Sequence, residues 1–349
     1  MKIKTIRGDF KSKLEKIGKM DKVINFGIPH VGEQIFRSLE IRDLVKCLKV
    51  SKTWKALTEN VLVKRCAVRA LEMCALGLEE VVQVLLEHPG GQNIDWNARD
   101  FSRDSILTLA CLRGHHKVVK LLLDHSKAKR IDLSSLQHDA IEACKNGHGG
   151  VVQTLFQHPE AKKINWNEHY GNYYTGFMWA CQEGHANVVE VLLDHAHFGK
   201  IYFNLPVRTG TPFTGFMLAC LEGRENVVKI MLEHQNTKYI GKNLTYGYGR
   251  NAFGLTCERG SPRGQFAIIR LLMQHSGDKG INLNQKDIYG RTALEYACFK
   301  GHVDVVKCIL DNSHGTNLEI PTSAKLQEWK INQRACQRVK TLINNFRKK

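Results

Sequence analysis

One short pattern returns seven times along the 349-residue chain, and this repetition constrains the fold more than any other feature. Each copy has a cysteine, a glycine soon after it and then a run of paired apolar residues. Neighbouring copies lie 33 to 41 residues apart, at Cys74, Cys111, Cys144, Cys181, Cys220, Cys257 and Cys298. A period of this size is typical of stacked supersecondary units, because each unit is too small to bury its own apolar face.

The apolar spacing inside one copy predicts a pair of helices. Val118, Val119, Leu122 and Leu123 follow the spacing that places side chains on one helical face. A shorter apolar segment that ends at Cys111 predicts a first helix before it. Gly114 stands between the two helices and suits a tight turn, because it has no Cβ to clash. Equivalent cysteines are a full repeat apart, so we expect reduced, buried thiols rather than disulfides.

Histidine closes the second helix in six of the copies, at His88, His125, His158, His195, His234 and His275. A polar side chain at a helix C-terminus can bond the last free carbonyls, so we expect a structural role for these residues. Six positions later an isoleucine follows each time, at Ile94, Ile131, Ile164, Ile201, Ile240 and Ile281. An extended stretch leading into a turn is expected from there on.

The last copy carries a Tyr289-Gly290-Arg291 turn, then Thr292-Ala-Leu-Glu, then a Gly301-His302 pair, and it resembles the ankyrin repeat. The resemblance covers residues 67–318. It implies an all-α fold with short β-hairpin loops, in which about seven ankyrin repeats form a solenoid. It also implies that partners bind the concave surface, which the hairpin tips and first helices line.

Aromatic residues and arginines are concentrated at the expected hairpin tips. These residue types dominate interface energetics, since they bury a large area or present a planar set of donors. We therefore predict that a target protein, whose identity the sequence does not reveal, contacts Phe101, Arg103, Tyr170, Tyr173, Arg208, Tyr246, Tyr248, Arg250, Tyr289 and Arg291. The alternative is that Tyr173 and Tyr246 only pack on adjacent hairpins.

Residues 26–66 lack the repeated pattern and predict three short helices, the second with Asp43 as its N-cap. This segment resembles an F-box, although His30 and Gly32 depart from the family pattern. The resemblance implies docking on a Skp-type adaptor of a cullin–RING ubiquitin ligase. The expected adaptor contacts are Pro29, Val31, Ile35, Phe36, Leu39, Leu44, Leu48, Val50, Trp54 and Leu57. The alternative is that these helices only cap the array.

The net charge of +17 is concentrated at the two ends of the chain. Residues 1–70 hold 17 lysines and arginines against 7 acidic residues, and residues 319–349 hold 8 against 2. A nearly neutral array disfavours nucleic acid as a partner. Residues 1–25 form a basic amphipathic arm, for which packing on the chain or partial disorder is preferred over membrane binding. Residues 319–349 predict a basic helix that caps the last repeat.

No residue pattern points to catalysis, a cofactor or a metal. Cys111 and His115 have a spacing that metal ligands can share, but a buried thiol and a turn histidine explain both. The glycine-rich segment 247–254 lacks the Lys-Ser/Thr ending of a phosphate loop. We therefore expect no enzyme, no cofactor and no metal. Because no secretory or membrane-spanning segment stands out, we expect an intracellular protein, cytoplasmic, nuclear or both, that is not secreted.

Two readings of function survive. In the first, the protein is the substrate receptor of a Skp–cullin–RING ubiquitin ligase, in which the F-box-like segment holds the ligase and the repeats hold the target. In the second, it is an ankyrin scaffold unrelated to ubiquitin. An enzyme is the third and weakest reading, because no nucleophile–base pair stands out.

Overall fold

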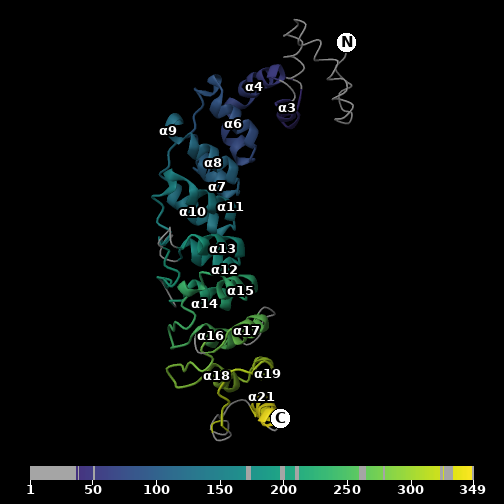
Figure 1. Cartoon of the computed structure of the whole chain (residues 1–349), viewed down its shortest axis with the longest axis vertical. Coiled ribbons are helices and arrows are strands. Elements are labelled where there is room, and N and C mark those ends of the chain that lie inside the picture. Colours follow the sequence, from purple (N-terminus) through teal and green to yellow (C-terminus); the bar gives the residue numbers. More distant parts are fainter. Residues whose placement is uncertain are drawn as a thin grey trace, which may run out of the picture. The chain divides into compact units, whose positions relative to one another are not determined.

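The computed structural model describes residues 37, 39–49, 52–169, 174–196, 201–208, 212–258, 265–277, 280–322, 325 and 333–347 (Figure 1). Two compact units make up the chain, residues 1–133 and 134–349.

Among its described residues, the first unit has two helices followed by two repeats. Its elements are α3 (Ile41–Cys47), α4 (Lys52–Cys66), the 3-10 turn η1 (Ala67–Arg69), α5 (Ala70–Ala75), α6 (Glu79–Glu87), η2 (Pro89–Gly91), α7 (Ile106–Leu112), α8 (His116–Asp124) and α9 (Ser126–Lys129). α3 packs on α4, and α4 packs on α6 of the first repeat. The F-box-like helices therefore rest directly on the second helix of that repeat.

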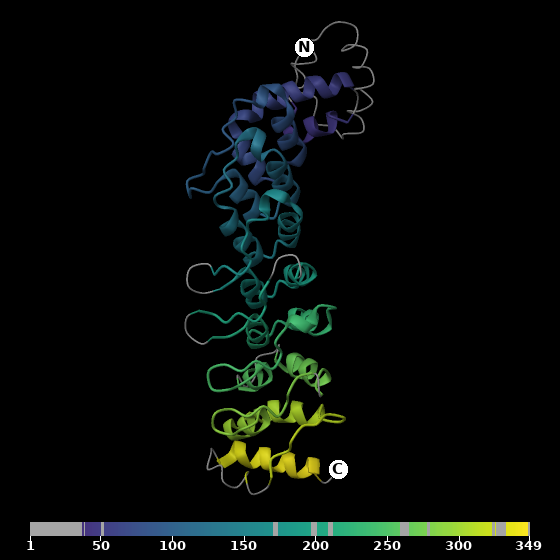
Figure 2. The same ribbon diagram turned by 60° about the vertical axis from the view of Figure 1, so that its left-hand side comes forward.

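The second unit holds five helix pairs and a terminal helix among its described residues. They are α10 (Leu136–Lys145) with α11 (Gly149–Gln157), α12 (Gly176–Glu183) with α13 (Ala186–Asp194), α14 (Gly215–Leu221) with α15 (Glu225–Glu233), α16 (Ala252–Glu258) with α17 (Gln265–Gln274), α18 (Ala293–Lys300) with α19 (Val303–Asp311), and α21 (Gln333–Arg347); η3 (Pro159–Ala161) and η4 (Thr237–Tyr239) are short turns. First helices contact first helices and second helices contact second helices, so two columns form within this unit (Figure 2).

The predicted all-α ankyrin fold is confirmed. The described hairpin loops pair through single bridges rather than through regular strands. Arg99 and Ser105 form one isolated antiparallel bridge, and Tyr246 and Arg250 form another. Loops with so little backbone pairing depend on side-chain hydrogen bonds for their shape.

Small polar residues fix where the first helices begin. The side-chain oxygens of Ser105, Thr175, Thr214 and Thr292 each accept a hydrogen bond from the backbone N–H three residues later. The Glu295 carboxylate in turn accepts a hydrogen bond from the backbone N–H of Thr292, which completes a capping box. The expected turn at Gly114 is present, with a left-handed φ of 77°.

The repeated cysteines lie in the core, as the spacing predicted. All seven are buried thiols, and the paired valines next to them, such as Val118 and Val119, are buried as well. Burial raises the pKa of Cys74 to about 12. These thiols therefore act as small apolar side chains that fill the space between repeats.

The histidines at the ends of the second helices have structural roles of two kinds. His125, His195 and His275 place Nδ1 2.9 Å from the carbonyl oxygen four residues earlier and donate to it. In His88, His158 and His234, Nδ1 instead accepts from the backbone N–H two residues later. The second group begins the turn after the helix rather than closing the helix itself.

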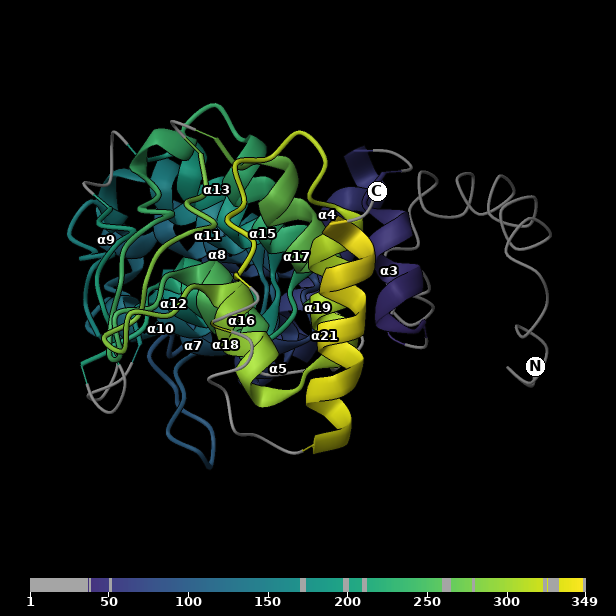
Figure 3. The same cartoon turned by 90° about the horizontal axis from the view of Figure 1, so that it is seen from below.

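α21 lies against the last repeat. It contacts α18 and α19 (Figure 3). Its Val339 and Ile343 are buried. Of the segment 319–349 that was predicted to form this element, residues 323–324, 326–332 and 348–349 lie outside the described residues. Among the described residues, none of the helices combines the length and the apolar character that a bilayer crossing requires.

Two expectations for the F-box-like segment need correction. Asp43 is not an N-cap: α3 begins at Ile41 after Glu40, and Asp43 lies in its first turn, where it pairs with Lys46 at 3.2 Å. The helix expected around Trp54 continues to Cys66, because its later apolar residues, such as Val61 and Leu62, are also buried.

Candidate binding surface on the hairpins

Asp287 shapes the hairpin turn of the last repeat. Its Oδ1 accepts hydrogen bonds from the N–H groups of Tyr289 and Arg291, both at 2.9 Å. Its own N–H bonds to the Arg291 carbonyl at 2.8 Å, and Gly290 completes the turn at φ 74°. One carboxylate thus holds the whole tip, residues 287–291, in a fixed shape.

The same turn occurs at residues 100–104 of the first unit. Asp100 accepts from the N–H groups of Ser102 and Asp104, both at 2.9 Å. Arg103 stands where the other tip has glycine and keeps the left-handed conformation, with φ 68°. Such a conformation strains a residue with a Cβ. At the top of this rigid turn, Phe101 is fully exposed.

Asparagine side chains join successive hairpins. In the second unit, Asn204, Asn243 and Asn284 each donate through Nδ2 to a carbonyl of the next repeat, at 2.7 to 3.0 Å. Their Oδ1 atoms accept from a nearby N–H of that repeat, at 2.6 to 2.8 Å. Asn97 makes the same pair of bonds in the first unit. We call this series the asparagine ladder, and it keeps neighbouring tips in register.

A buried charge cluster lies beneath the tips of the last two repeats. Arg250 is only 7% exposed and forms ion pairs with Glu258 and with Asp287, the latter at 3.5 Å. Arg291 reaches the same Asp287 oxygen at 3.0 Å. Burial would raise the pKa of the Asp287 carboxyl, but hydrogen bonds from Arg291 and from the Tyr289 N–H hold it below its usual value.

Tyr296 on α18 completes this cluster. The guanidinium carbon of Arg250 lies 4.1 Å from the centre of its ring, and that of Arg291 lies 5.1 Å away. The Tyr296 hydroxyl donates to Glu258 at 2.9 Å. The ring and the two guanidinium groups hold one another in place, so the surface above them is preorganised.

A hollow of about 440 Å³ opens above this cluster. Residues of two hairpins and two first helices line it: Tyr248, Arg250, Glu258, Tyr289, Arg291, Tyr296, Phe299 and Lys300. Its volume lies in the range of small ligand sites. We call it the tyrosine hollow.

The predicted target contacts fall into four groups. Phe101, Arg103, Arg208, Tyr248 and Tyr289 are exposed, Tyr246 and Arg291 are half-buried, and Arg250 is buried, whereas Tyr170 and Tyr173 lie outside the described residues. The structure brings Tyr248, Arg250, Tyr289 and Arg291 together in the tyrosine hollow. The sequence prediction missed Tyr296, Phe299 and Lys300, because they belong to a helix rather than to a tip. It also missed the exposed Ile288, whereas Tyr202, exposed on another hairpin, does not line the hollow.

The predicted adaptor contacts are only partly visible. Pro29, Val31, Ile35, Phe36 and Val50 lie outside the described residues. Leu44 and Trp54 are fully buried and hold α3 and α4 together, while Leu39, Leu48 and Leu57 are half-buried. Of the described contacts, Leu39, Leu48 and Leu57 therefore retain surface that a partner could reach.

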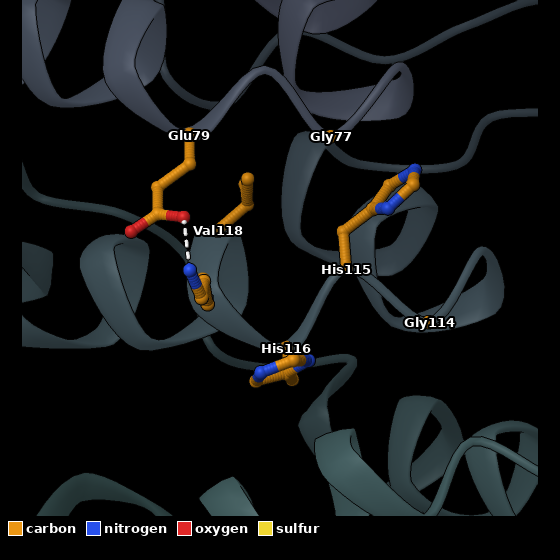
Figure 4. Close-up of a pocket in the computed structure, with 7 residues that line it drawn as sticks. Gly77, Glu79, Gly114, His115, His116 and Val118 are labelled. Carbon is orange, nitrogen blue, oxygen red and sulfur yellow. Dashed lines mark ion pairs between the residues drawn. The ribbon is translucent and has the colours of Figure 1, made fainter.

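A smaller hollow of about 230 Å³ lies in the first unit, at the turns between first and second helices (Figure 4). Here Lys117 pairs with Glu79 at 2.9 Å, and His115 lies over Gly77 with its Nε2 3.0 Å from the Ala75 carbonyl oxygen. A Cβ at Gly77 would come within 2.4 Å of the His115 ring. The imidazole thus packs one repeat on the next, and none of the described residues that line this hollow is a tyrosine, phenylalanine or tryptophan.

Comparison with known protein families agrees with this fold. A family model described as ankyrin repeats (3 copies) matches residues 70–165, 140–240 and 216–321, and a model described as F-box domain matches residues 29–66. The ankyrin matches cover most of the chain, which therefore belongs to the ankyrin-repeat family and carries an F-box domain at its N-terminal end. A search of curated proteins found no match.

Two solved structures are similar to this chain. The human ASB11 ankyrin repeat domain is 20% identical, with a TM-score of 0.50, over 73% of this chain and 99% of that one. The ankyrin repeat domain of Bcl-3, a member of the IkappaB protein family, is 16% identical, with a TM-score of 0.50, over 68% of this chain and 97% of that one. At these identities the likeness establishes the fold. Ankyrin repeats and F-box domains are interaction domains without catalytic chemistry, so the chain is a protein-interaction module.

Proposed function

We propose that this protein is the substrate receptor of a Skp–cullin–RING ubiquitin ligase. The observation that carries the proposal is the order of its domains: an F-box match at residues 29–66 is followed at once by ankyrin matches from residue 70. Such a chain holds a ligase at one end and a target along the rest. It raises the effective concentration of target lysines near the ubiquitin-loaded enzyme without performing bond chemistry itself.

The packing of the F-box helices supports this proposal. Leu44 and Trp54 fix α3 on α4, which leaves Leu39, Leu48 and Leu57 with part of their surface in water. Half-exposed leucines on a small helical unit are suited to a partner that covers them. A unit that served only as a cap would have a polar outer face instead.

The hairpin surface supports the target-binding half of the proposal. It presents rigid tips with exposed aromatic rings, among them Phe101, Tyr248 and Tyr289. Rigid aromatic anchors lose little conformational entropy when a partner covers them. The alternative function is an ankyrin scaffold without a link to ubiquitin, in which the same surface would hold its partner.

Co-purification of the full chain with a Skp-type adaptor tests the proposal. We expect micromolar or tighter binding, and we expect Leu48→Asp together with Leu57→Asp to abolish it, because two charges would enter an apolar contact. The matched control is Lys120→Asp on α8, which adds the same charge at an exposed position of the array. Absence of adaptor binding by the folded wild-type chain would leave only the scaffold function.

A further inference from the structure

The face around the tyrosine hollow is positively charged. The hairpins and first helices of the last two repeats, residues 241–258 and 281–300, carry five basic side chains and three acidic ones. Each acidic side chain is already paired: Glu258 with Arg250, Asp287 with Arg291, and Glu295 with Lys325. The carboxylates of this face are therefore not available to a partner.

Three of its cations remain without an ion pair. Within the part of the chain that the structure describes, Lys242, Lys286 and Lys300 have no carboxylate partner. Lys300 lines the hollow itself, with its Nζ 5.6 Å from the centre of the Tyr296 ring and 6.0 Å from that of Phe299. An anion that reached Lys300 would thus lie close to the aromatic rings of Tyr296 and Phe299.

The rim of the hollow is apolar and exposed. Tyr248 is 58% exposed, Tyr289 is 62% exposed, and their rings stack with centres 6.3 Å apart. Ile288 between the tips is 63% exposed. Covering these side chains would remove apolar surface from water, which favours a partner with an apolar group at this point.

The rim is also rigid. The Ile288 N–H donates to the Tyr248 carbonyl at 2.9 Å, which joins the two tips through the backbone. Below the two tips, the Asp287 carboxylate forms ion pairs with both Arg250 and Arg291. Little ordering is needed on binding, so a short segment of a partner can be held.

These features select among partners. A basic segment would meet the unpaired Lys242, Lys286 and Lys300 and would find each carboxylate occupied. A nucleic acid would need a basic stripe along the repeats for its phosphates, and the repeat array is nearly neutral. A peptide that carries a carboxylate next to an apolar side chain matches the free Lys300 and the exposed tyrosine rings at the same time.

We infer that the tyrosine hollow binds an extended target segment in which an aspartate or glutamate stands beside an aromatic or large aliphatic residue. The carboxylate pairs with Lys300, and the apolar side chain packs on Tyr248 and Tyr289. This inference rests on the proposed function, because it names the chemistry of the target that the repeats hold.

Immobilised peptides test the inference with the full chain as the soluble partner. Each peptide carries one two-residue core, Asp-Phe, Glu-Leu, Asn-Phe or Lys-Phe, between Gly-Ser spacers. We expect the two acidic cores to bind and the Asn-Phe core to bind about tenfold more weakly, since it lacks the charge. The Lys-Phe core should bind least, and salt should weaken the acidic cores.

Variants locate the binding. Lys300→Gln and Tyr289→Ala should each weaken binding of the Asp-Phe core about tenfold. Their matched controls are Lys307→Gln on α19 and Tyr202→Ala on another hairpin, both exposed and both outside the hollow, which should change nothing. Thermal unfolding checks that all four variants are folded.

Equal binding of the Asp-Phe and Lys-Phe cores, equal effects of Lys300→Gln and Lys307→Gln, or no binding by any acidic core would each overturn the inference. Adaptor binding is measured on the same samples. A wild-type chain that binds the acidic cores but no adaptor would contradict the ligase function and leave the inference standing, so the two failures are distinguishable.

Discussion

The guanidinium of Arg250 lies 3.5 Å from the carboxylate of Asp287, which belongs to the hairpin of the following repeat. Arg250 also pairs with Glu258 at the end of its own first helix. This buried side chain therefore couples two repeats, although its position at a hairpin tip predicted a contact with the target. Its role is to support the tyrosine hollow from below.

Replacement of Arg250 by alanine should destabilise the array. The change leaves Glu258 without its cation and removes one of the two cations at the buried Asp287, so we expect a loss of about 2–4 kcal/mol in the free energy of unfolding. Urea denaturation followed by circular dichroism measures it. Lys286→Ala, an exposed lysine beside the same hairpin, is the control and should change the stability by less than about 0.5 kcal/mol. A similar small change in Arg250→Ala would contradict the structural role.

The stability that Asp287 contributes should depend on pH. Its pKa is lower in the folded chain than in the unfolded one, so its contribution is fully present above the unfolded pKa of about 4 and is lost as the pH falls through the folded pKa. We expect the difference in unfolding free energy between wild type and Asp287→Asn to be constant from about pH 5 to 8 and to shrink below about pH 4. Urea titrations at each pH measure the difference. If this difference in unfolding free energy grew toward acid pH, it would contradict a lowered pKa of Asp287 in the folded chain.

Most of the fold could be predicted from the sequence, because it depends on local spacing. The Cys181 pattern and the Val188-Val189 pair recur with one period, and a period of that kind has few structural solutions. The first helices were harder to delimit, since the Thr175 cap became evident only from its hydrogen bond to the Met178 N–H.

The candidate site could be predicted only in part, because burial depends on residues far apart in the sequence. Tyr248 and Tyr289 are exposed, as tip residues should be. Arg250 is buried because Glu258 and Asp287 approach it from two other segments, which no local pattern reveals. Lys300 was missed because only the packing of α18 places it at the hollow.

The asparagine ladder should be sensitive to loss of a single donor. In Asn204→Asp the side chain can no longer donate to the Tyr239 carbonyl and places a negative charge near it, so we expect a loss of about 1–2 kcal/mol in unfolding free energy. The matched control is Asn226→Asp, an exposed asparagine in the first turn of α15, where a negative charge is tolerated. Urea denaturation compares the two. Equal stability of both variants would show that the ladder adds nothing to the packing of the helices.

Cys181 should behave as a core residue rather than as a reactive thiol. It is fully buried, and its Sγ packs against Gly215 of the next repeat. A Cβ added at position 215 would lie only 3.1 Å from the Cys181 Sγ. Burial raises the pKa of its thiol well above the usual value. Cys181→Ser should therefore lose about 1–2 kcal/mol in unfolding free energy, because its hydroxyl must be desolvated.

The thiols also provide a readout in the wild-type chain. We expect Cys181 to be alkylated slowly by a maleimide in the native state and fast in urea, since the reagent must wait for the repeats to open. Mass spectrometry of the peptide that contains Cys181 follows the reaction, and Cys181→Ala is the control for its assignment. Native and urea rates that agree within a factor of about two would disprove the burial, because a thiol with a raised pKa between two packed repeats is neither ionised nor accessible.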